Sequence, residues 1–232
     1  MKSLVFDSGP VISLATNNLL WVLEPLKKEF NGQFCITSAV KAEIVGRPLE
    51  TKKFKFEAIQ VEKLIEDGIL DVVDNGFIHE KTSILLSTAN EIFKAYGNYM
   101  RIVHLAEISV IAASLSLNAG AIVIDEKTTR YLMEDPKFIA NILRKTLHTP
   151  IAVNENNLKE FESAVKGIRA IRSVELVTVA YERGMLDKYI TSMPDARKSL
   201  LEGLLWGLKL NGCAVSKEEI GQIVRLEIKE TK

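Results

Sequence analysis

The 232-residue sequence has little of several features that would point directly to a function. It contains only two cysteines, Cys35 and Cys213, which lie far apart and in no zinc-ligand spacing. This scarcity excludes a zinc ribbon and is typical of a reducing compartment. The 30 basic and 30 acidic side chains cancel, so the net charge argues neither for nor against a nucleic-acid partner.

A membrane-spanning run is also missing. The longest uncharged run, residues 108–124, is interrupted by Asn118, Ala119 and Gly120, so it predicts a helix, a turn and a strand instead of a membrane span. A strand pattern begins at Leu4, which leaves no room for a signal peptide. We therefore expect a cytoplasmic protein with no membrane partner.

What the sequence does contain is an alternation of short apolar strand patterns with helix patterns. This alternation predicts an α/β protein, a three-layer α/β/α sandwich with a central parallel sheet. The expected strands are residues 4–6, 34–37, 69–73, 121–124 and 150–153. The expected helices are residues 11–30, 39–45, 54–66, 78–96, 104–118 and 127–147, the last with a break near Pro136.

Beyond residue 153 the strand patterns stop, and helices are expected at 158–166, 174–182, 196–210 and 217–228. Asn211-Gly212 predicts a left-handed helix end, and Ser216 with Glu219 predicts a capping box. The chain thus divides into an α/β domain, 1–153, and a helical C-terminal extension, 154–232. Apolar faces on the last two helices support the hypothesis of a homodimer.

Four carboxylates lie in or beside apolar stretches that should be buried. Asp7 ends the first strand pattern, Asp125 ends the fourth, and Glu43 and Glu107 lie on helices. A buried carboxylate without a partner is costly, so it protonates, pairs or coordinates a metal. Carboxyl ends of parallel strands meet at one edge of the sheet, where these acids can converge. Oxygen ligands without histidine or thiolate favour Mg²⁺ or Mn²⁺.

Each acid also has a simpler explanation. Asp7 and Asp125 each precede a helix and could serve only as its cap. Glu43, close to Lys41, fits a solvated surface. Glu107 is the hardest to explain in this way, because its helix is apolar on nearly every face.

Around these acids the sequence resembles the PIN-domain nucleases. Three blocks carry the resemblance: residues 6–12 (FDSGPVI), residues 36–44 (ITSAVKAEI), and residues 107–125 with the Glu126, Lys127 and Arg130 that follow. The resemblance covers about residues 1–153, and residues 208–220 are similar to tails of some archaeal and bacterial relatives. It implies a metal-dependent nuclease, usually acting on single-stranded RNA, with water as the nucleophile.

One block departs from the family pattern. Many relatives carry Gly-Glu-x-Glu at the start of the third-block helix, whereas this chain has Ala-Glu-Ile-Ser at 106–109. Ser109 therefore cannot supply the extra carboxylate. At the other end of the block, Asp125 or Glu126 could be the last ligand, and we prefer Asp125 because it directly continues the apolar strand.

These considerations predict hydrolysis of a phosphodiester by a metal-activated water. The predicted metal ligands, which are also the predicted catalytic residues, are Asp7, Glu43, Glu107 and Asp125. The residues predicted to hold the nucleic-acid substrate are Ser8, Arg101, Lys127, Thr128 or Thr129, and Arg130.

Two alternatives from other classes stay open. The first is a catalytically silent PIN-like protein that binds nucleic acid or acts as a scaffold. The second is a phosphatase-like hydrolase with an aspartyl nucleophile, which would need a second acid where the chain has Gly9. Within the nuclease class, the chain fits a toxin of a toxin–antitoxin pair, with a protein inhibitor, or a processing nuclease.

Overall fold

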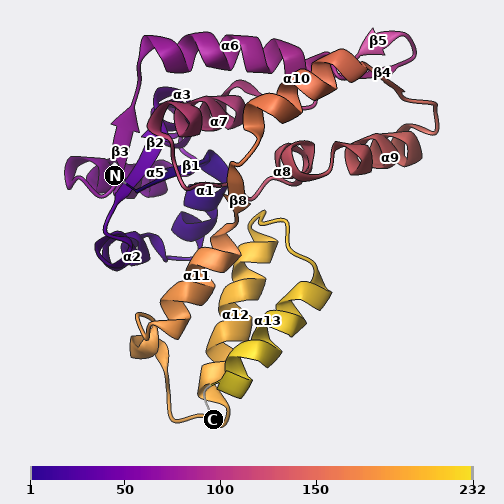
Figure 1. Cartoon of the computed structure of the whole chain (residues 1–232). Coiled ribbons are helices and arrows are strands. Elements are labelled where there is room, and N and C mark those ends of the chain that lie inside the picture. The colour runs from indigo at the N-terminus through magenta and orange to yellow at the C-terminus, as the bar shows by residue number, and fades with distance from the viewer. Residues whose placement is uncertain (1, 231–232) are drawn as a thin grey trace.

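A parallel sheet of five strands forms the centre of the protein (Figure 1), whose computed structural model describes residues 2–230. The strand order is β3-β2-β1-β6-β8, and every neighbouring pair is parallel. The strands are β1 (Ser3–Phe6), β2 (Gln33–Thr37), β3 (Asp71–Val73), β6 (Ala121–Val123) and β8 (Arg169–Ile171). The chain builds outward from β1 through β2 to β3, then returns to β6, so the strand order reverses between β1 and β6.

Helices cover both faces of this sheet, which confirms the predicted α/β/α sandwich. One face carries α7 (Leu105–Leu117), which contacts β1, β2 and β6, and α6 (Gly76–Asn90) packs on α7. The other face carries α1 (Ser8–Thr16), α2 (Leu23–Phe30) and α11 (Ser173–Glu182) (Figure 1). The shorter elements are η1 (Leu20–Val22), α3 (Ser38–Lys41), η2 (Ala42–Gly46), α4 (Arg47–Glu50) and α5 (Lys55–Glu66).

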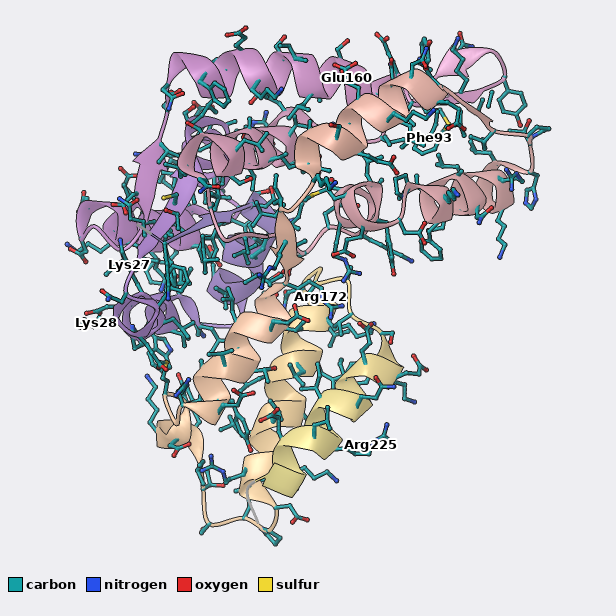
Figure 2. All side chains as sticks on the ribbon, in the orientation of Figure 1. Lys27, Lys28, Phe93, Glu160, Arg172 and Arg225 are labelled. Atoms are coloured by element: carbon teal, nitrogen blue, oxygen red, sulfur yellow. The ribbon has the colours of Figure 1, made fainter. Side chains whose placement is uncertain are left out.

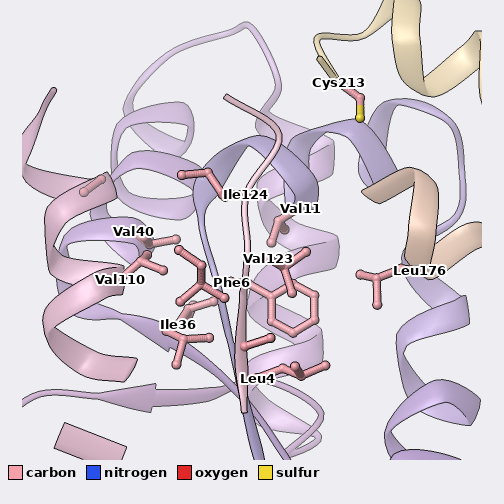
Figure 3. Close-up of a cluster of buried hydrophobic side chains, with 14 of the residues drawn as sticks. Leu4, Phe6, Val11, Ile36, Val40, Val110, Val123, Ile124, Leu176 and Cys213 are labelled. Atoms are coloured by element: carbon pink, nitrogen blue, oxygen red, sulfur yellow. The ribbon is translucent and has the colours of Figure 1, made fainter. Parts of the chain in front are cut away.

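Apolar side chains fill the space on both sides of the strands. Figure 3 shows Val40 and Val110 on one side and Leu176 on the other. Phe6 is fully buried and its ring centroid lies 5.1 Å from that of Phe34 on the neighbouring strand. The unbroken apolar runs of β1 and β6 are those of central parallel strands, which are covered on both faces.

Three predicted elements differ from the structure. The predicted strand 150–153 is observed as β7 (Ala152–Val153), outside the parallel sheet, where it pairs antiparallel with β4 (Phe93–Ala95). β4 also pairs with β5 (Asn98–Tyr99), so the predicted helix 78–96 ends at Asn90. The predicted helix 11–30 divides as well, because Asn18 takes a left-handed conformation (φ 55°).

The prediction that residues 154–232 form helices only is also wrong. α10 (Glu155–Val165) packs against α6, and β8 completes the central sheet beside β6. Only three residues form β8, and they have no run of apolar residues that would predict a strand. The domain boundary at residue 153 stays a prediction, but the sheet itself continues to Ile171.

The predicted C-terminal helices and their caps are present. α12 (Ala196–Leu210) and α13 (Lys217–Glu230) pack together, and α11 packs on α12, with the short η3 (Asp187–Tyr189) between α11 and α12. Gly212 has a φ of +113°, and the capping box is made by reciprocal bonds between Ser216 and Glu219 at 2.7 and 3.0 Å.

The apolar faces of these helices are used largely inside the chain. Leu208, Ile220 and Val224 are buried, so the homodimer stays a prediction. Within residues 2–230 no helix is both long enough and apolar enough to cross a membrane.

Candidate metal centre at the carboxyl edge of the sheet

Asp7 lies where β1 ends and α1 begins, close to the point where the strand order reverses. Its Oδ2 accepts a hydrogen bond from the Gly9 N–H at 3.3 Å, so the predicted capping role is real. The cap uses only one oxygen. Oδ1 is buried and has no hydrogen-bond partner within the described part of the chain, and the whole residue is 3% exposed. An acid with half of its carboxylate unsatisfied has capacity for another ligand.

The pKa of Asp7 also indicates that its charged form lacks a stabilising partner. Its pKa is raised to about 7, mainly by burial and also by the negative charges of Glu107 and Glu43, against the lowering effect of the Ser8 and Gly9 N–H groups. Glu43 belongs to the π-helical turn η2, and its Oε1 lies 4.0 Å from the Arg47 guanidinium. Single π-helical turns occur frequently at functional sites.

Glu107 lies in the first turn of α7. Its Oε2 accepts a hydrogen bond of 2.5 Å from the His104 N–H, which closes the N-terminus of the helix. Burial raises the pKa of Glu107, the charges of Glu126 and Glu43 raise it further, and the bond from His104 lowers it. Three acids from separate parts of the chain therefore repel one another across this edge of the sheet.

Asp125 and Glu126, the two candidates for the last ligand, have different surroundings. Both residues follow the end of β6, whose Val123 pairs in register with Phe6, so both lie close to the start of α1. The Asp125 carboxylate accepts bonds from Ser13 Oγ at 2.9 Å and from the N–H and Oγ of Ser173 at 2.7 Å. Both carboxylate oxygens of Asp125 thus have partners within the protein, and Asp125 as a metal ligand stays a prediction.

The alternative explanation of Asp125 as the cap of the next helix is wrong. Glu126 is the N-cap of α8 (Lys127–Glu134), because its Oε2 accepts a 2.6 Å bond from the Thr129 N–H. Together with its charge effect on Glu107, this position makes Glu126 the fourth member of the cluster, which we call the acid cluster: Asp7, Glu43, Glu107 and Glu126.

The predicted substrate residues flank the acid cluster on two sides. Ser8 begins α1, and Lys127, Thr128 and Arg130 follow Glu126 on α8. Arg101 is exposed and lines a cavity of about 600 Å³ between α6 and α7. Lys127 and Arg130 lie over the Tyr131 ring, at 5.6 and 5.0 Å from its centroid. Tyr131 is not among the residues predicted from the sequence, because it belongs to none of the motifs found there.

Ser109, in the place of the family's second glutamate, bonds inside the protein. Its Oγ lies 2.7 Å from Thr37 Oγ1 and donates to the Ala106 carbonyl at 2.6 Å. Both residues line the cavity between α6 and α7. A neutral hydroxyl pair thus joins the end of β2 to α7 without a further negative charge.

The acid cluster fits a divalent cation by its chemistry, although no ready-made coordination shell exists. Among the described residues no three histidine, cysteine, aspartate or glutamate side chains converge as a metal-ligand group. The reason is local, because Glu107 and Glu126 each bond a backbone N–H in their own helix. A cation would give the Asp7 Oδ1 a partner and would reduce the repulsion among the four acids. The side chains of Glu107 and Glu126 would have to rotate towards it.

The fold and the acid cluster together define an α/β protein with a candidate metal centre where the strand order reverses. Residues 3–137 match the family model DUF3368, which is a PIN domain. This match spans more than half of the chain, so the protein belongs to the PIN-domain family and has its nuclease-like fold. Neither the curated proteins nor the solved structures gave a match.

Proposed function

We propose that this protein is a metal-dependent nuclease that hydrolyses phosphodiester bonds of single-stranded RNA. The observation that carries the proposal is the Asp7 carboxylate, which is buried, has an unpartnered Oδ1 and faces two further acids. Such an arrangement has no structural benefit of its own, because like charges in a buried site destabilise the fold. It is explained if the site holds Mg²⁺ or Mn²⁺.

In this proposal the four residues of the acid cluster hold the cation. When bound, the cation supplies a lowered pKa for its water ligand and neutralises charge on the phosphate. The protein's own contribution is to orient: Asp7 is fixed by the cap of α1, and Glu107 and Glu126 lie at the N-termini of α7 and α8. Lys127 and Arg130 would hold the phosphates of the strand, since four acids alone would repel a polyanion.

A second function is favoured by one observation. Glu107 and Glu126 are satisfied by local hydrogen bonds, and the described residues offer no assembled metal-ligand group. A PIN-like protein that binds nucleic acid or a partner without cleaving it would also have these features. The roles of toxin with a protein inhibitor or of processing nuclease, and the cytoplasmic location, stay predictions.

The test is cleavage of an end-labelled single-stranded RNA, and of a DNA of the same sequence, with Mn²⁺, with Mg²⁺ and with EDTA. The proposal expects cutting of RNA that EDTA stops and that Glu107→Gln abolishes. The matched control is Glu66→Gln on α5, an exposed glutamate far along the chain from the acid cluster, which should cleave like the wild type. Cutting that survives EDTA or Glu107→Gln would refute the proposal.

A further inference from the structure

The segment that directly follows Glu126 forms an arm of two helices. α8 (Lys127–Glu134) and α9 (Pro136–Leu147) run away from the sheet, on the opposite side from β3, and do not lie against α12 or α13 in Figure 1. Pro136 begins α9 and Asp135 caps it by accepting a bond from the Phe138 N–H at 3.2 Å. This break turns α9 back so that its first residues meet the face of α8.

The arm carries an excess of positive charge in a chain whose net charge is zero. Residues 127–147 contain five cations, namely Lys127, Arg130, Lys137, Arg144 and Lys145, against two acids. Within residues 2–230 none of the five forms an ion pair, whereas Lys27, Lys41 and Arg172 elsewhere are paired with carboxylates. Four of the five are exposed and Arg130 is half-buried. Cations that no carboxylate neutralises are the groups that attract a polyanion.

Two aromatic rings lie among these cations. The ring centroids of Tyr131 and Phe138 are 4.4 Å apart, and Phe138 is 36% exposed. Lys127 Nζ lies 5.6 and 5.4 Å from the two centroids, and the Arg130 guanidinium lies 5.0 Å from that of Tyr131. Lys145 shares the face of Phe138, seven residues or about 10 Å further along α9. Exposed rings with adjoining cations are how proteins hold single strands without reading their sequence.

We propose that this α8–α9 cluster, made by Lys127, Arg130, Tyr131, Phe138 and Lys145, binds the single strand next to the scissile phosphate. Phe138 stacks on a base, Lys127 and Arg130 hold the phosphates beside it, and Lys145 holds the strand further from the acid cluster. The inference rests on the proposed function in one respect, namely that the bound strand continues from a scissile phosphate at the acid cluster. The binding surface itself depends only on the rings and the unpaired cations.

The test is fluorescence anisotropy of a labelled single strand of about 12 nucleotides in EDTA, where nothing is cleaved. Phe138→Ala should weaken binding of the full chain roughly 5- to 100-fold, and Phe138→Trp should restore it. Lys127→Ala should lower the slope of log affinity against log salt by about 0.7, because one phosphate contact is lost.

Matched controls come from other helices, where Phe77 at the start of α6 is 51% exposed and Lys28 on α2 is exposed and paired with Glu24. Phe77→Ala and Lys28→Ala should bind like the wild type. The proposal is overturned if Phe138→Ala and Lys127→Ala keep wild-type affinity, or if the control variants lose as much. It is also overturned if polyglutamate binds as tightly as RNA and if Phe138→Ala changes neither affinity.

The binding test and the nuclease test fail separately. If the wild type cleaves RNA with Mn²⁺ but binding ignores the α8–α9 variants, the surface is wrong and the proposed function stands. If binding falls as expected while no metal supports cleavage, the surface stands and the silent binding protein replaces the nuclease.

Discussion

Asp125 holds Ser173 through both of its carboxylate oxygens, since Oδ1 accepts from the Ser173 N–H and Oδ2 from the hydroxyl, each at 2.7 Å. The backbone carbonyl of Asp125 also accepts a bond of 3.1 Å from the Ala214 N–H. One residue before Glu126, the end of the strand is therefore tied to α11 and to the connection between α12 and α13. The C-terminal helices thus help to position the segment that carries Glu126.

This relationship predicts that Asp125 acts on stability. Asp125→Asn replaces one accepting oxygen by an NH₂ group, which cannot accept the hydrogen bonds that Ser13 and Ser173 donate. The free energy of unfolding should therefore fall by about 1–3 kcal/mol. Ser173→Ala should cost about 1 kcal/mol, because the backbone bond remains. Urea unfolding of the metal-free protein measures both. If Asp125→Asn were as stable as the wild type but unable to bind Mn²⁺, Asp125 would be the ligand after all.

Glu126 should show the opposite behaviour. Glu126→Gln keeps an oxygen that can accept from the Thr129 N–H, so stability should change by less than about 1 kcal/mol. RNA cleavage should fall by at least about 100-fold, because the proposed metal centre would lose one of its ligands. Glu134→Gln, at the other end of α8 and exposed, is the matched control and should cleave normally. Wild-type cleavage by Glu126→Gln would remove Glu126 from the acid cluster.

Asp7 predicts how the stability of the metal-free protein depends on pH. Its pKa of about 7 in the folded state lies above the ordinary value of 3.8, so the folded state binds more protons than the unfolded state between these values. Stability should therefore fall by roughly 2–4 kcal/mol as pH rises from 4 to 7. Thermal unfolding across this range should show the fall in the wild type and a flatter curve in Asp7→Asn. Equal curves would mean that Asp7 is not strained by burial.

Arg172 should be essential for the attachment of the C-terminal helices (Figure 2). Its side chain is 9% exposed and bonds Glu175 at 2.6 Å, Glu219 at 2.9 Å and the Ala214 carbonyl at 2.9 Å. Arg172→Ala should cost about 1–3 kcal/mol of unfolding free energy, because the Ala214 carbonyl loses its donor and the partly exposed Glu175 and Glu219 lose their cation. Arg183→Ala, which breaks an exposed pair with Glu29, should cost at most about 1 kcal/mol. Similar losses would contradict this account.

A chain that ends at residue 153 should not fold as a stable domain. It would lose β8 and α10, leave β6 as an exposed edge and remove the donors that satisfy Asp125. We expect aggregation, and no cooperative unfolding transition in urea. A cooperative transition like that of the full chain would support the boundary predicted from the sequence.

Strong local patterns in the sequence were sufficient to predict much of the fold. The apolar runs of β1 and β6 and the capping box of Ser216 and Glu219 are set by neighbouring residues, and the structure has them. β8 could not be predicted in this way, because three residues at the edge of a sheet are held by pairing with β6 and not by their own composition.

The candidate site shows the same division between local and non-local information. Asp7 and Glu107 stand out because an acid beside apolar residues is unusual. The choice between Asp125 and Glu126 depends on the distant Ser13 and Ser173, which bond Asp125, and on the distant Glu107, whose pKa is raised by Glu126. Likewise, Phe138 meets Lys127 only because Pro136 turns the chain between them.

The most direct test of the central claim is a titration of the metal-free full chain with Mn²⁺. Binding is measured by electron paramagnetic resonance, as a decrease in the signal of the free ion. The account predicts saturable binding by the wild type and its loss in Asp7→Asn, which should be at least as stable as the wild type without metal. Absence of binding by the wild type, or equal binding by Asp7→Asn, would contradict a metal centre at the acid cluster.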